Sequence, residues 1–167
     1  MINGTFAKDL LDALVNQGNK KTVSFDTTNA YLGLFTSVPH ADGTGGVEVS
    51  ATTLPGYHRR ALGEKALSGS YQFGTPAAFH ATTTEDPHDY YYIRNTGDIQ
   101  MNAIDESASG EAVVKGVGIF RGSTSDAELL AWGPLVNKDG SENTTGVKLV
   151  AGSVPIFYAG SFELRIE

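Results

Sequence analysis

After Gly18, the chain is a succession of short segments in which apolar and polar residues alternate, separated by turns that contain glycine. Alternation with a period of two is typical of strands that bury one face. The run Tyr31–Phe35 is apolar throughout, which is typical of a central strand covered on both faces. Further strand candidates are 47–50, 57–62, 77–82, 90–94, 99–103, 112–120, 128–132, 147–150, 154–157 and 161–166.

Turn chemistry separates these segments, as in Asp42-Gly43, Pro55-Gly56, Asp139-Gly140 and Ala159-Gly160. No helical periodicity lies between the strand candidates, so a parallel sheet with crossover helices is excluded. The pattern predicts a mainly β protein, an antiparallel β-sandwich of the jelly-roll type.

The opening segment has a different period. Residues 5–17 carry apolar side chains three and four apart, which predicts an amphipathic helix capped by Thr5 and ended by Gly18. The expected organisation is therefore an N-terminal helix at 1–18 and a single β-sandwich domain at 19–167. We expect the helix stripe to act as an assembly surface between copies of the chain. Its residues are Phe6, Leu10, Leu11, Leu14 and Val15.

Composition narrows the classes of function. The 167 residues are enough for one domain, and they carry 12 Lys and Arg against 19 Asp and Glu, for a net charge of −7. Such an acidic chain is poorly suited to gripping phosphates, so direct nucleic-acid binding is not expected. No apolar stretch is long enough for a membrane helix, and no signal peptide is visible, which favours synthesis in a cytoplasm.

The search for chemistry yields no candidate catalytic, cofactor or metal site. The chain has 4 His and no Cys, and no two histidines have the spacing of metal ligands. No Gly-x-Ser-x-Gly motif marks a serine nucleophile. We therefore expect a protein that is not an enzyme and that needs no cofactor.

Tyr90, Tyr91 and Tyr92 form the most conspicuous aromatic group. On a strand, alternate side chains face opposite sides, so at least one of these rings could be exposed for an interface or for stacking on a sugar. The alternative is that two rings lie in the core and one at its rim.

Three stretches, 30–62, 116–135 and 148–164, contain motifs that are similar to those of a known protein family. They contain Leu34-Phe35-Thr36-Ser37, Gly43-Thr44-Gly45-Gly46, Glu48-Val49-Ser50, Gly56-Tyr57-His58-Arg59, Val117-Gly118-Ile119-Phe120, Trp132-Gly133-Pro134-Leu135 and Ala151-Gly152. In this order the motifs resemble small bacteriophage virion proteins of the tail-fibre or minor structural type. The chain departs from that pattern at His58, where Ala is usual, and in 65–110, which lack the usual tryptophan-rich strand.

The resemblance implies a non-enzymatic structural protein of a phage or prophage virion, associated with the tail or fibre and acting through protein–protein assembly. Its expected partners are other virion proteins and further copies of itself, with a host surface glycan as an additional candidate. One alternative stays open within this picture, a capsid decoration protein, and a carbohydrate-binding β-sandwich module is a second alternative from a different class. A small hydrolase is a third.

Overall fold

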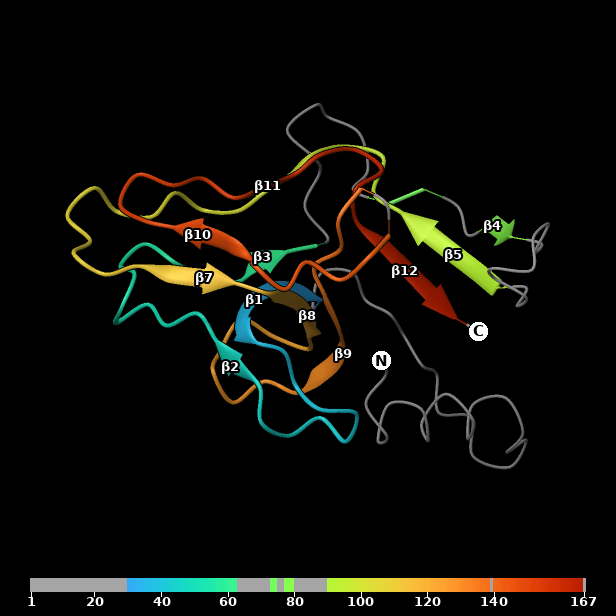
Figure 1. Cartoon of the computed structure of the whole chain (residues 1–167), viewed down its shortest axis with the longest axis horizontal. Helices are drawn as coiled ribbons and strands as arrows, with labels where there is room; N and C mark the ends of the chain where they lie inside the picture. Colours follow the sequence, from blue (N-terminus) through green and yellow to red (C-terminus); the bar gives the residue numbers. More distant parts are fainter. Residues whose placement is uncertain (1–29, 63–72, 75–76, 80–89, 139, 167) are drawn as a thin grey trace.

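The computed structural model describes residues 30–62, 73–74, 77–79, 90–138 and 140–166. These residues form β-strands and turns and contain no helix, and all strand pairs are antiparallel (Figure 1). The strands are β1 (Tyr31–Ser37), β2 (Val47–Glu48), β3 (Arg60–Ala61), β4 (Ala77–Phe79), β5 (Tyr90–Arg94), β6 (Ile99–Gln100), β7 (Ala112–Val114), β8 (Gly116–Phe120), β9 (Leu129–Pro134), β10 (Val147–Leu149), β11 (Ile156–Phe157) and β12 (Glu163–Ile166).

The largest sheet has five strands in the order β2-β1-β8-β9, with β3 also paired to β1. β1 lies in its interior, and its register with β8 runs from Tyr31 opposite Phe120 to Phe35 opposite Gly116. Leu32, Leu34 and Phe35 are buried. The prediction of a central strand at 31–35 is confirmed.

The two faces of this sheet pack against different apolar clusters. Leu32 and Leu34 point into the main core, which they share with residues such as Ile104. Phe35 belongs to a smaller cluster with Phe120 and Trp132. This alternation follows from the period of two along a strand, which sends neighbouring side chains to opposite faces.

Two glycines make room for the smaller cluster. A Cβ atom on Gly33 would lie 2.7 Å from Cε2 of Phe120, and one on Gly118 would lie 2.5 Å from Cε2 of Phe35. Both distances are shorter than any van der Waals contact, so no larger residue fits without moving a ring. Glycine inside a strand is expected where a backbone or a bulky ring approaches closely, and rings do so at these two positions.

The remaining strands form three small sheets, β10-β7, β11-β6 and β12-β5-β4. The segment 112–120, expected as one strand, is divided at Lys115. Residues before it pair with β10, and residues after it pair with β1 and β9. In Figure 1, β7, β10 and β11 lie toward one end of the molecule, and β4, β5 and β12 lie toward the other.

The expected fold class is therefore wrong. In place of a jelly-roll-like sandwich of two facing sheets with one helix, the described residues form one five-stranded sheet with small antiparallel sheets around it, and none is helical. The physical reason is that alternation tells which face of a strand is buried but not which strand it pairs with. The helix expected at 1–18 lies outside the described residues. Within the described ranges, no helix is long and apolar enough to span a bilayer.

Candidate functional site

A buried cation holds the large sheet to its loops. The Arg59 side chain is 4% exposed, and its Nε and Nη2 donate to the two carboxylate oxygens of Glu48 at 2.9 and 2.6 Å. Its Nη1 donates to the main-chain carbonyls of Gly122 and Thr124, in the connection between β8 and β9. This two-pronged arginine–carboxylate geometry is the strongest form of charge-assisted hydrogen bonding.

Tyr57 completes this polar cluster. Its hydroxyl donates to Oε1 of Glu48 at 2.9 Å and accepts from the main-chain N–H of Leu34 at 2.8 Å. Burial raises the pKa of the Tyr57 hydroxyl well above its usual value, and the nearby Glu48 carboxylate acts in the same direction. The cluster thus joins residues before β3, strand β2 and the central strand β1.

Glu48 and Glu64 are the acidic residues close to Arg59 and Arg60 in the sequence, which makes them the expected partners. The Arg59–Glu48 pair is confirmed, whereas Glu64 lies outside the described residues. In this cluster the donors of Arg59 and Tyr57 are directed at groups of the chain itself, which suits a role in holding strands together.

Asn95 is a second buried clamp, at the end of β5. Its side-chain N–H groups donate to the carbonyls of Gly97 at 2.9 Å and Tyr158 at 2.8 Å, and also approach that of Phe157 at 3.2 Å. Its Oδ1 accepts from the N–H of Phe162 at 2.9 Å. One amide side chain therefore connects the β5–β6 turn to the β11–β12 turn, more than 60 residues away in the sequence.

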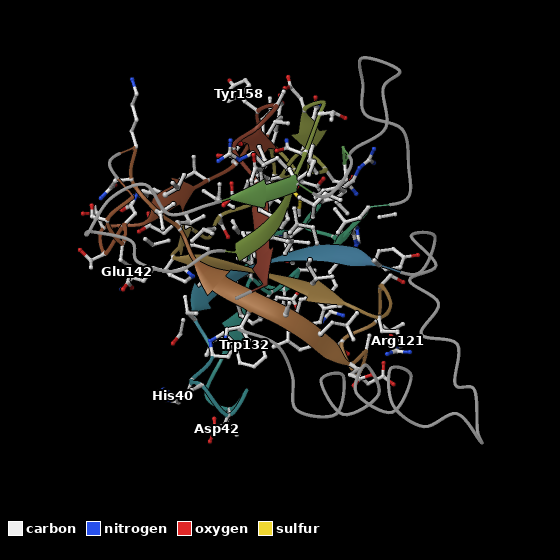
Figure 2. All side chains as sticks on the ribbon, turned by 90° about the vertical axis from the view of Figure 1, so that its right-hand side faces the viewer. His40, Asp42, Arg121, Trp132, Glu142 and Tyr158 are labelled. Carbon is white, nitrogen blue, oxygen red and sulfur yellow. The ribbon has the colours of Figure 1, made fainter. Side chains whose placement is uncertain are left out.

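The loop between β1 and β2 covers Trp132, whose Nε1 donates to the carbonyl of Pro39 at 3.1 Å. Gly43 lies against the indole ring with a φ of +82°, a conformation that favours glycine. Hydrogen bonds from the Thr44 N–H and hydroxyl to the carboxylate of Asp42 lower the pKa of that carboxyl. Figure 2 shows His40, Asp42 and Trp132 at the same edge, with Tyr158 at the opposite end of the view.

An apolar groove of about 370 Å³ opens between β10 and β11. Its floor includes Leu34, Val114 and Leu135, and its walls are residues 147–149 and 153–157. The two walls are consecutive strands, but β10 pairs with β7 and β11 pairs with β6, so they are not paired to each other. The exposed large apolar side chains gather near this groove: Val147, Val150, Val154, Ile156 and Tyr158.

The structure places part of the predicted interface set. Tyr90, Tyr91 and Tyr92 lie on β5, in the sheet with β4 and β12. The Tyr92 ring is half-buried, with the Arg94 guanidinium 4.8 Å from its centre. The helix-stripe residues Phe6, Leu10, Leu11, Leu14 and Val15 lie outside the described residues, so their role stays a prediction.

Within the described part of the chain, no three His, Asp, Glu or Cys side chains come together in a group that could hold a metal ion. The groove and the Asn95 clamp were missed by the sequence analysis. Residues 147–158 did carry a signal for the groove, because Lys148 is their only charged residue in an otherwise apolar or neutral stretch. The sequence Asn95-Thr96-Gly97 indicates only a local turn.

A family model described as podophage GP4 fiber I protein gp80 matches residues 5–156. The chain belongs to this family. This membership confirms that the chain resembles phage fibre proteins. The particular motif pattern in the three stretches stays a prediction. Membership also implies a location in the virion and contact with other virion proteins. No curated protein matches the chain.

Proposed function

We propose that this chain is a non-enzymatic structural component of the phage tail fibre that acts by packing against other virion proteins. The family match covers 5–156 and supports the fibre role. The observation that carries the assembly role is the gathering of exposed apolar side chains at residues 147–158, around an open apolar groove. Apolar surface collected in one place on a soluble protein is typical of an interaction site.

The buried polar groups support the non-enzymatic part of the proposal. Arg59 and Asn95 are the most buried polar residues in the described part of the chain, and each is directed at carboxylate or carbonyl oxygens that hold separate strands together. A group used in this way stabilises the fold and is not presented to a substrate.

Immunogold electron microscopy of purified phage particles tests the location. Antibody raised against the chain should place gold at the tail fibres of intact particles. Gold on the capsid would replace the fibre role with capsid decoration, and a protein present in the lysate but absent from purified particles would overturn the proposal. A panel of ester and glycoside substrates tests the non-enzymatic part, since turnover that is lost when the protein is unfolded would contradict it.

Binding of a host glycan is a second candidate, favoured by the Tyr158 ring, which is 66% exposed at the turn before β12. Exposed aromatic rings stack on sugars through their apolar faces. On a glycan array the intact chain would then bind a defined sugar, and Tyr158→Ala would lose that binding while Tyr92→Ala, on the half-buried ring, would retain it. An array with no bound sugar would remove this candidate.

A further inference from the structure

Most of the exposed large apolar residues in the described part of the chain lie in the surface formed by residues 147–158. Of the seven large apolar residues that are exposed in the described part of the chain, five lie in these twelve residues, and the other two are Val47 and Val136. We call residues 147–158 the β10–β11 face. Its five exposed apolar side chains are between 39% and 66% exposed.

The groove adds unpaired strand edges to this apolar surface. The turn between β10 and β11 is closed, because the Ser153 N–H donates to the Val150 carbonyl at 3.0 Å and the Val150 N–H donates to Ser153 Oγ at 2.9 Å. The strands nevertheless diverge beyond this turn and pair with β7 and β6 instead of with each other. Each wall of the groove therefore has an edge without a strand partner in the described residues, and such edges favour association with another chain.

Charge indicates what covers this face. The whole chain carries a net charge of −7, so two copies repel each other overall. The β10–β11 face itself has a single charged residue, Lys148, and the nearest carboxylate with which it pairs, that of Glu111, neutralises it, so two copies can meet there without a net charge on either face. Lys148 pairs with Glu111, and both side chains are more than half exposed. This rim of one cation and one anion is complementary to the same rim on a second copy.

We infer that copies of this chain associate with their β10–β11 faces directed toward one another, so that the apolar groove of each is covered by the other. The inference rests on the proposed assembly function and names the surface and the partner. Val154 and Ile156 would then lose their exposure on association, while Val136 would keep its own. A partner protein of a different kind on this face is an outcome that the test separates.

Sedimentation velocity of the full chain across roughly two decades of protein concentration tests the inference. The unsubstituted chain should show concentration-dependent association. Val154→Asp, which places a carboxylate at the groove, should weaken association by at least about tenfold. Val136→Asp is the matched control, because it makes the same change at a more exposed valine outside the face, and it should leave association within about twofold.

Lys148→Glu provides a second variant that should fold normally, since both members of its ion pair are largely exposed. It makes the face acidic, so association should weaken more at low than at high salt. Circular dichroism during heating, at a concentration where the parent chain is monomeric, should give the same melting temperature for the variants and the parent chain.

A chain that sediments as a monomer throughout would overturn the inference, as would equal weakening by Val136→Asp and Val154→Asp. If that monomeric chain is still found at the fibres of purified particles, the proposed function stands and another partner occupies the face. Absence from the particles overturns the proposed function instead.

Discussion

The guanidinium carbon of Arg59 lies 3.5 Å from the centre of the Phe120 ring, while its nitrogens hold Glu48. The cation is thus bound by a ring on one side and by a carboxylate and main-chain carbonyls at its edge. Charges removed from water are stabilising only when they are paired and hydrogen-bonded, and this site meets both conditions. Phe120 also belongs to the small cluster with Phe35 and Trp132, so the ion pair and the apolar packing are coupled.

Substituting Arg59 should destabilise the fold strongly. Arg59→Ala leaves Glu48 without its cation and should lower the free energy of unfolding by about 3 kcal/mol. Arg121→Ala is the control, because the side chains of the Arg121–Glu128 pair are 48% and 34% exposed, and its effect should stay below about 1 kcal/mol. Chemical denaturation measures both values, and similar losses for the two variants would show that the Arg59 cluster is not a stabilising element.

Tyr57 should make the free energy of unfolding depend on pH in the alkaline range. Its pKa is raised in the folded chain above the ordinary value of 10.0, chiefly by burial, so the folded state holds the hydroxyl proton more tightly than the unfolded state. The resulting stability is fully present below pH 10 and is lost as the pH rises toward the folded-state pKa, with a slope of up to about 1.4 kcal/mol per pH unit.

Tyr57→Phe isolates this contribution. At neutral pH the variant should be less stable by about 1 to 3 kcal/mol, because the N–H of Leu34 loses its acceptor in the core. Between pH 9 and pH 11 its stability should fall less than that of the parent chain. Parallel pH dependences in denaturation experiments would contradict the assignment to Tyr57.

Removing the Asn95 side chain should loosen a defined part of the molecule. Asn95→Ala abolishes the side-chain hydrogen bonds to the 157–162 region and should lower the free energy of unfolding by about 3 kcal/mol. Hydrogen exchange should accelerate most at the Phe162 amide. Asn102→Ala, at an exposed position, should change stability by less than about 0.5 kcal/mol. Unchanged exchange at Phe162 would count against a clamp.

Two glycines of the large sheet should respond differently to the same change. Gly118→Ala brings a methyl group against Phe35 and should lower the free energy of unfolding by about 1 to 3 kcal/mol. Gly133→Ala, on the adjacent strand β9, meets nothing within 4 Å and should be nearly neutral. Thermal unfolding compares the two variants, and an equal loss in both would mean that ring contact does not decide the effect.

Local sequence patterns were sufficient to predict the structure around a residue where its neighbours are determined by its own strand. The continuous apolar run at 31–35 predicted an interior strand, and glycine inside a strand is typical of close approaches such as those of the rings to Gly33 and Gly118. The Arg59–Glu48 pair was also accessible, because opposite charges at nearby positions suggest partners.

Pairing between distant segments was not accessible in the same way. Nothing in the alternation of 112–120 indicates that Lys115 separates two strands with different partners. The acceptors of Asn95 become neighbours only when β5 and β12 pair. The groove likewise depends on β10 and β11 pairing elsewhere, which a hairpin-like sequence does not predict.

Asn95 also determines how the molecule would bear tension. β12 pairs with β5, and its register runs from Ile166 opposite Tyr91 back to Glu163 opposite Arg94. A pull on the Ile166 end would peel these pairs apart one at a time, which requires little force. The peeling front then reaches Phe162, whose N–H and C=O are both held by Asn95. Several bonds must rupture together at that point, so load applied at this end of the chain is carried into the body through a single residue.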